Sequence, residues 1–278
     1  MELFQKILDC KEEEVDPIIE KAINEANTNA EKIERLGFLD YGKSYSVFKG
    51  FIPLKTRIKY ANINMEDYGM ETTDFIYEFA HFIRNYNISS KTSLIYNLEY
   101  FVNSYFGFPD KIDRGQIFNE IAWQTTTTDE DYFKALENNK LGDLKGKGAA
   151  QCTERGALAQ QILSIFGFET YYCMGCLDLG DKQEGHCFNI VKRKNDYALL
   201  DYSIPITSYN EDGSLRAYYP FVGIITNEEF LDFINNGIVK SIDNYYMKGK
   251  QQEKVGTQRM YIVGKYEIDK ENKNGKVL

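Results

Sequence analysis

The chain has few histidines, tryptophans and cysteines: its 278 residues include two histidines, one tryptophan and five cysteines. Five irregularly spaced cysteines do not make a disulfide framework, because an odd number leaves at least one thiol unpaired. This cysteine usage favours a reducing compartment. Only His81 and His186 can supply an imidazole, so histidine-dependent chemistry has two candidates.

The chain also lacks long apolar runs and an excess of basic residues. No segment approaches the roughly 20 apolar residues of a membrane-spanning helix, and the opening MELFQK contains no signal-peptide core. We therefore expect a cytoplasmic protein without membrane binding, with signal-independent export as the alternative. The 33 basic and 42 acidic residues give a net charge of −9, which disfavours nucleic-acid binding because phosphate contacts need clustered Lys and Arg.

The hydrophobic content of 43% is ample for the core of one large domain or two small ones. We expect an α+β chain with a helical N-terminal accessory region, residues 1–110, followed by a catalytic core, residues 111–278. Helices are predicted at residues 16–36, 73–86, 90–107 and 226–237. The segment 37–64 is expected to be irregular or to form short strands, 259–268 to be a strand, and 269–278 to be a mobile polar tail.

Cys152 stands at the start of a further predicted helix. The glycine-rich segment GKGAAQ precedes it, and apolar residues at helical spacing continue to Phe166 before Gly167, a residue type typical of the position just after a helix. Free N–H groups and the helix dipole favour a thiolate there. We therefore expect Cys152 to be the fastest-reacting cysteine near neutral pH, with a pKa below the usual value of about 8.5. The alternative is a small buried cysteine used for packing.

Two strand-like segments, 186–191 and 196–201, flank the polar turn 192–195. If this hairpin closes about the bond between residues 193 and 194, His186 lies directly opposite Asp201. Opposite side chains on one face have Cβ atoms about 4.5–5.5 Å apart, so the carboxylate can hold one ring nitrogen and present the other. The other histidine, His81, lies outside the apolar arc of its predicted helix and is expected on the solvent side.

Arg155 lies within the apolar arc of the Cys152 helix, whereas five polar residues lie opposite that arc: Thr153, Glu154, Gln160, Gln161 and Ser164. A buried guanidinium needs a carboxylate or carbonyl partner. We expect a structural ion pair, and a clamp for a substrate carboxylate is the alternative.

Four potential zinc ligands fall in one short stretch: Cys173, Cys176, His186 and Cys187. Residues adjacent in a strand, or three apart, point to opposite faces, which disfavours one shared ion. The extended setting also disfavours a thioredoxin-like role for the cysteine pair, because its first cysteine should open a helix. We therefore predict neither a metal nor a cofactor.

Residues 148–205 resemble the core of the transglutaminase-like superfamily, part of the wider papain-like cysteine enzymes. The matching elements are, in chain order, the small-residue turn before Cys152, the apolar helix ending at Gly167, the strand Thr170–Gly175, His186 at the start of a strand and Asp201 at the end of the next. Residues 117–123 resemble the helix that often precedes the nucleophile turn of this superfamily.

The resemblance implies a helix, with the nucleophile at its N-terminus, packed on an antiparallel sheet. It implies Cys152 as nucleophile, His186 as general base and then acid, and Asp201 as the orienting carboxylate. The leading function is hydrolysis of a peptide or amide bond in a peptide or protein substrate, through a thioester. The alternatives are transfer of the acyl group to an amine, as in a transglutaminase, and a peptide-binding module without turnover.

Such chemistry requires a crevice that a ligand can enter and two donors for the oxyanion. The backbone N–H of Cys152 is one candidate. The indole N–H of Trp123 or the amide of Gln124 is the other, although packing in the core is the commoner role of a tryptophan.

Overall fold

The computed structural model describes residues 2–28, 34–36, 46–50, 73–107, 145–146, 150, 152–178, 183–212, 215–236, 238–242, 244–248, 251–254, 259–262, 266–268 and 275–277. The helices in these ranges are α1 (Leu3–Asp9), η1 (Glu12–Glu14), α2 (Val15–Thr28), α3 (Thr73–Asn85), α4 (Lys91–Phe106), α6 (Cys152–Ile165) and α7 (Asn227–Asn236). The strands are β1 (Glu34–Leu36), β2 (Ser46–Lys49), β3 (Thr170–Asp178), β4 (Gln183–Lys192), β5 (Tyr197–Tyr209), β6 (Leu215–Ile225), β7 (Ile238–Ile242), β8 (Asn244–Lys248), β9 (Gln251–Lys254), β10 (Arg259–Ile262), β11 (Tyr266–Ile268) and β12 (Gly275–Val277).

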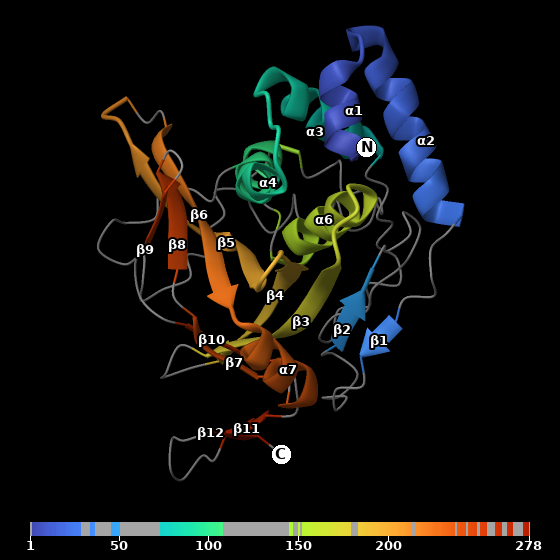
Figure 1. The fold of residues 1–278 in the computed structure, drawn as a ribbon. Helices are drawn as coiled ribbons and strands as arrows, with labels where there is room; N and C mark the ends of the chain where they lie inside the picture. The colour runs from blue at the N-terminus through green and yellow to red at the C-terminus, as the bar shows by residue number, and fades with distance from the viewer. Residues whose placement is uncertain are drawn as a thin grey trace.

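The fold is α+β, as predicted, with N-terminal helices followed by a helix packed on an antiparallel sheet (Figure 1). Within the described ranges, ten strands form one sheet in the order β1-β2-β3-β4-β5-β6-β8-β9, and β10 pairs with both β3 and β7. The consecutive strands β3 to β6 pair antiparallel. Strands β11 and β12 pair separately near the C-terminus.

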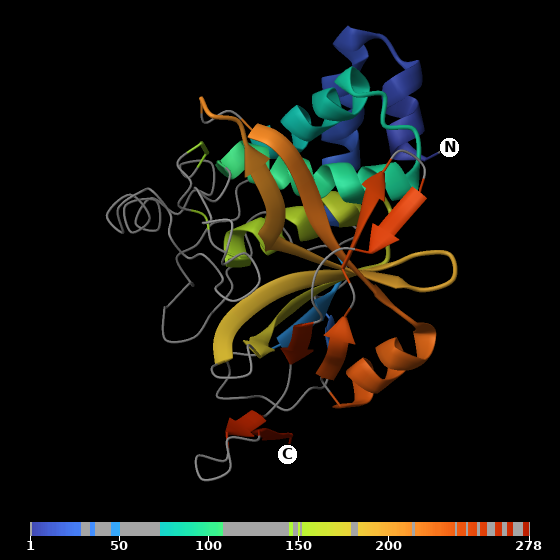
Figure 2. The same cartoon turned by 90° about the vertical axis from the view of Figure 1, so that its left-hand side faces the viewer.

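Helix α6 lies between the N-terminal helices and the sheet (Figures 1 and 2). It packs on β3, β4 and β5 on one side and on α2 and α4 on the other. Gly156 permits the close approach to β3, because a Cβ at this position would lie 3.0 Å from a ring carbon of Tyr172. The neighbouring Tyr171 instead contacts Phe230 of α7, with ring centroids 5.1 Å apart. Since successive strand residues point to opposite faces, α6 and α7 cover opposite faces of the sheet.

The predicted helix ends at Ser90, Thr226 and Gly167 are confirmed. Ser90 Oγ accepts a hydrogen bond from the backbone N–H of Ser93 at the start of α4. Thr226 and Glu229 form the reciprocal capping box that opens α7, with bonds of 2.7 and 3.1 Å. Gly167 has φ +78°, the left-handed conformation that terminates α6.

Several predicted boundaries are wrong. The helix predicted over residues 16–36 is α2, which ends at Thr28, and residues 34–36 pair with β2 as a strand. The strand predicted over 259–268 is divided between β10 and β11, which belong to different sheets. The predicted polar tail contains β12, which pairs with β11. Strand β10 is held by β3 and β7, which are distant in sequence, whereas β1 and β11 each pair with the next strand along the chain. Local periodicity reports neither kind of pairing.

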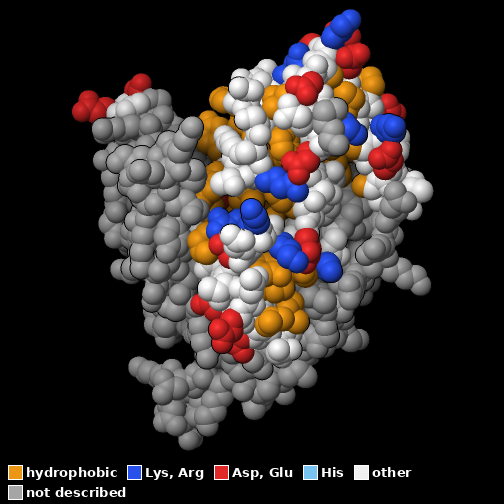
Figure 3. Space-filling view, viewed as in Figure 1, with side chains coloured by type: hydrophobic (Ala, Val, Ile, Leu, Met, Phe, Trp, Pro, Cys, Tyr) orange, Lys and Arg blue, Asp and Glu red, His pale blue; other side chains and the backbone are white. Residues whose placement is uncertain are grey.

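One buried apolar cluster runs from Phe4 in α1 to Val222 in β6 and includes Cys152. The N-terminal helices and the α6–sheet unit therefore share a core. The predicted division near residue 110 stays a prediction, because 108–144 lie outside the described residues. On the face seen in Figure 3, side chains of both charges are interspersed with apolar ones. Among the helices that the structure describes, none is long and apolar enough to cross a bilayer.

Candidate active site

Cys152 is the first residue of α6, as predicted, and its side chain is 3% exposed. The helix is buried almost all round, because it lies between two layers. Polar residues opposite its apolar arc are therefore enclosed as well: Thr153, Glu154, Gln160 and Gln161. The polar side of the α6 helical wheel is therefore buried and does not face solvent.

Buried hydrogen bonds fix α6 to the sheet beneath it. The Gln160 side chain accepts hydrogen bonds from Thr170 Oγ1 (3.0 Å) and Asn189 Nδ2 (2.9 Å), and it donates one to the Gly50 carbonyl (2.7 Å). At the residue after Cys152, the Tyr172 hydroxyl donates to the Thr153 carbonyl (3.2 Å). Buried hydrogen-bond networks favour one packing arrangement, so the helix that carries the thiol has a defined position on the sheet.

The hairpin register differs from the prediction by two residues. Strands β4 and β5 pair Lys192 with Tyr197 and Asn189 with Leu200, so the turn is centred on residues 194 and 195. A bidentate ion pair between Arg193 and Asp196 closes this turn. The two-residue difference preserves which face each side chain occupies.

His186 and Asp201 are nevertheless in contact. His186 Nε2 lies 2.7 Å from Asp201 Oδ2, and both side chains are fully buried. In this register Asp201 lies diagonal to His186, not opposite it, and the β4–β5 ladder has ended at Asn189. Strand β5 continues to Tyr209 instead of closing at Asp201, and its pairing with β6 is irregular just after Asp201. Bulges near functional sites re-aim side chains.

Asp201 stabilises the protonated form of His186. Burial lowers the pKa of the imidazole, but the charge and hydrogen bond of Asp201, aided by Cys152, raise it to about 10. Since Asp201 holds Nε2, Nδ1 is the ring nitrogen that remains for the thiol. A buried carboxylate–imidazole pair of this kind is typical of catalytic sites, although structural pairs also shift pKa values.

The environment of Cys152 does not match the predicted low pKa. A hydrogen bond with Cys187 and burial raise the pKa of Cys152 well above its ordinary value, whereas the neighbouring imidazole of His186 lowers it. Cys187 is buried, and its Sγ lies 3.5 Å from Thr153 Oγ1. Cys187 was predicted to point to the opposite strand face from His186, and its contact with Cys152 was not predicted. No local pattern indicates that contact, since it depends on where the tip of α6 meets β4.

Cys187→Ala is expected to shift the pH profile of Cys152 alkylation toward lower pH, because it removes a hydrogen bond that raises the pKa of the Cys152 thiol. Iodoacetamide labelling across pH, read by mass spectrometry of the Cys152 peptide, measures the shift. Cys173→Ala is the matched control, since Cys173 is also a fully buried thiol. If neither variant moves the profile, or both move it equally, Cys187 does not control the Cys152 thiol.

Arg155 is buried, and the bonds described for its guanidinium are to neutral acceptors; the expected ion pair stays a prediction. Its guanidinium donates to the carbonyls of Ala150 and Gly107, both at 3.0 Å, and to the side-chain oxygen of Asn103. It also lies over the Phe106 ring, 5.6 Å from the centroid. These bonds use all three of its nitrogens within the protein, which favours a structural role over a substrate clamp.

His81 is partly exposed, as predicted, with its side chain 34% accessible. Its two ring nitrogens lie 2.9 Å from carboxylate oxygens of Glu12 and Asp16. His81 therefore joins α3 to η1 and α2. Of the two histidines, His186 is the one beside a buried thiol.

The structure does not describe two of the predicted site residues. Trp123 and Gln124, the second oxyanion candidates, lie outside the described residues, as does the segment 117–123. The cysteines whose side chains are described, Cys10, Cys152, Cys173 and Cys187, are free thiols. In this same part of the chain, no group of three or more His, Cys, Asp or Glu side chains is arranged to hold a metal ion.

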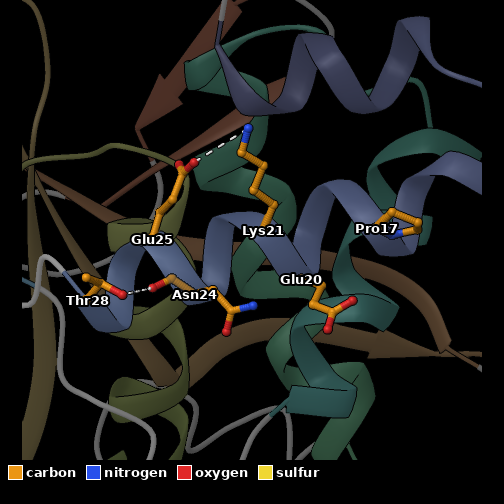
Figure 4. Close-up of a pocket in the computed structure, with 6 residues that line it drawn as sticks. All are labelled: Pro17, Glu20, Lys21, Asn24, Glu25 and Thr28. Carbon is orange, nitrogen blue, oxygen red and sulfur yellow. Dashed lines mark hydrogen bonds and ion pairs between the residues drawn. The ribbon is translucent and has the colours of Figure 1, made fainter.

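A surface hollow along α2 is separate from these buried groups. It is lined by Pro17, Glu20, Lys21, Asn24, Glu25 and Thr28 (Figure 4). Lys21 and Glu25 form an exposed i,i+4 ion pair there, and such pairs contribute little stability. Since Cys152, His186 and Asp201 contribute nothing to the lining, this hollow is not the predicted crevice.

Comparisons of the chain with known protein families, curated proteins and solved structures found no match.

Proposed function

We propose that the protein is a thiol-dependent acyl-transfer enzyme that hydrolyses a peptide or amide bond in a peptide or protein substrate. The observation that carries the proposal is the buried 2.7 Å bond between His186 and Asp201 beside Cys152. A thiol at a helix N-terminus, an imidazole coupled to it and a carboxylate that orients the imidazole are the three parts of a cysteine triad. Separate parts of the chain supply the thiol and the imidazole–carboxylate pair.

In the proposed reaction, Cys152 Sγ attacks the substrate carbonyl carbon and forms a C–S bond. His186 gives a proton to the leaving amine as the C–N bond breaks. Water then attacks the thioester while His186 accepts one of its protons, and the C–S bond breaks to release the carboxylic acid and restore the thiolate–imidazolium pair. Asp201 stays ionised and stabilises the imidazolium.

The protonation states of His186 and Cys152 support a protonated His186 as the acid that donates to the leaving amine. Because Asp201 raises the pKa of His186 to about 10, the ring is protonated at neutral pH. Loss of one proton from Cys152 then produces the thiolate–imidazolium pair. Burial and Cys187 oppose this loss, so we expect Cys152 reactivity to increase from neutral toward alkaline pH.

The enclosed trio represents the closed form of the proposed site. Cys152 is 3% exposed and the other two side chains are fully buried, so a substrate reaches the sulfur only after the surrounding chain moves. Closure that excludes water strengthens the electrostatic interactions within a site. Conformational opening of this kind sets the rate of many enzymes.

The fold supports placing the protein in the transglutaminase-like superfamily as part of this proposal. Helix α6 carries the thiol at its first residue and packs on an antiparallel sheet whose neighbouring strands carry His186 and Asp201. The order cysteine, histidine, aspartate along the chain is that of the resemblance. Fold alone does not determine the reaction, so hydrolysis and amine transfer must be separated by their products.

The second candidate function is a peptide-binding module of the same fold without turnover. The observation that favours it is the burial of the Cys152 sulfur together with its raised pKa. A thiol held in the protonated form is a poor nucleophile.

Reaction with p-nitrophenyl acetate, a small activated ester, tests the proposal. We expect a burst of nitrophenol followed by slower steady release, with Cys152→Ala as the blank. Acetic acid as product in the presence of a primary amine supports the hydrolase, and an acetylated amine supports the transferase. Equal rates for the wild type and the blank across pH would favour the module without turnover.

A further inference from the structure

We propose that Arg155 is a positioning residue that fastens the chain before Cys152 to the C-terminal end of α4. The inference rests on the proposed function and assigns a role to the N-terminal helices: α4 is the platform on which the nucleophile is placed. Arg155 does not touch the reacting atoms. It acts through Ala150, two residues before Cys152.

The Arg155 guanidinium joins three separate parts of the chain. Arg155 lies one turn after Cys152 in α6, and its Nε donates to the Ala150 carbonyl at 3.0 Å. Its Nη2 donates to the Gly107 carbonyl at 3.0 Å, and its Nη1 to the Asn103 side chain. The entry to α6, the end of α4 and the first turn of α6 are therefore held by one rigid planar group.

A second attachment lies a few residues upstream. The backbone N–H of Gly146 donates to the carbonyl of Tyr105 in the last turn of α4, at 2.8 Å. Next to it, Lys145 pairs with Glu78 of α3 and lies over the Tyr105 ring, 5.1 Å from the centroid. The chain that leads to Cys152 is thus tied to the end of α4 at residues 146 and 150.

The position of Arg155 suits a positively charged side chain that carries several hydrogen-bond donors in one plane. A helix C-terminus presents carbonyls without intrahelical partners and the negative end of the dipole. Arg155 is 2% exposed and Asn103 is fully buried, so both groups depend on partners within the protein. Lysine carries the charge but lacks the planar fork that reaches three acceptors. The geometry therefore requires arginine specifically.

Loss of Arg155 should slow the reaction because it changes the distance between Cys152 and His186. Displacing reacting groups by about 1 Å can lower a rate by about 10²-fold. Without Arg155, the entry to α6 loses its bond to α4, and Cys152 moves relative to His186, which is held independently by Asp201 on the sheet. The influence of His186 on the Cys152 thiol should weaken, and the pH profile of acylation should move toward higher pH.

Arg155→Ala is expected to lower the burst rate of p-nitrophenyl acetate by about 10–100-fold per folded molecule and to shift its pH profile upward. Arg155→Lys should recover only part of the rate. Asn103→Ala keeps the guanidinium but removes one of its acceptors, so it should also lower the burst rate and shift the pH profile upward. This variant replaces Arg155→Ala in the test if Arg155→Ala does not fold. Urea unfolding gives the folded fraction for each variant.

Arg84→Ala is the matched control. Arg84 also bridges segments, through the carbonyls of Ile7 and Cys10 and an ion pair with Glu12, but these partners belong to α1, η1 and a residue between them, not to α6 or the chain that enters it. It should lower stability without changing the pH profile. A wild type that shows no Cys152-dependent burst refutes the proposed function. A normal wild-type burst, with unchanged rate and profile in folded Arg155→Ala and Asn103→Ala, refutes the positioning role alone.

Discussion

Asp201→Asn is expected to lower the rate of Cys152 acylation by about 10⁴-fold while the protein stays folded. The Asp201 carboxylate accepts a hydrogen bond from His186 Nε2 at 2.7 Å, and this bond directs the other ring nitrogen toward the thiol. An asparagine amide fits the same space but carries no charge, and when its NH₂ faces the ring it favours the wrong tautomer. The imidazolium from which acylation starts also loses its counter-charge.

The same variant has a spectroscopic signature. In the wild type the pKa of His186 is raised to about 10; without the carboxylate, burial dominates, and the pKa should fall below the usual value of about 6.5. Proton NMR titration resolves this change because the chain has two histidines, and His81→Gln assigns the signals.

Asp196→Asn is the matched control for both measurements. Asp196 belongs to the same hairpin but pairs with Arg193 at its turn. It should leave the acylation rate and the titration of His186 unchanged. If Asp201→Asn acylates as fast as the wild type, Asp201 does not orient the imidazole for catalysis.

His186→Ala is expected to lower the free energy of unfolding by about 3–5 kcal/mol near neutral pH. The variant leaves the fully buried Asp201 without the imidazole to which it is bonded, and a buried carboxylate that loses its cationic partner is costly. Urea unfolding measures the loss. The double variant His186→Ala with Asp201→Ala should recover part of it, because the charge that needs a partner is also removed.

The sign of the pH dependence follows from the raised pKa. The pKa of His186 is about 10 in the folded protein and about 6.5 in the unfolded chain. The stabilisation is therefore fully present below about pH 6.5 and is lost as the pH rises through 10. The stability difference between the wild type and His186→Ala should decrease in that alkaline range. A difference below 1 kcal/mol at pH 7, or one that grows with pH, would contradict a buried ion pair.

The sequence contained enough local information to locate the parts of the site. Gly167 and the apolar spacing placed the Cys152 helix, and the alternation of the two hairpin strands placed His186 and Asp201 on one face. The two-residue register difference was compatible with that inference because the side-chain period is two. The predicted contact was therefore found, although in a diagonal arrangement.

The properties that depend on tertiary packing were not predictable in the same way. The low pKa expected for Cys152 came from the helix terminus alone, whereas burial and Cys187 reverse its direction. The partners of Arg155 lie near residue 105 and at residue 150, and no spacing pattern links them. Strand β10 pairs with the distant strands β3 and β7, and such pairings outweigh local propensity.

The central claim is that the Cys152 sulfur is the nucleophile and that His186 and Asp201 activate it. The most direct measurement locates the acetyl group by peptide mass spectrometry after brief reaction with p-nitrophenyl acetate and an acid quench. We predict the group on Cys152 in the wild type and its near absence there in His186→Ala and Asp201→Asn. An acetyl group on another side chain, or equal labelling of Cys152 in all three proteins, would contradict the account.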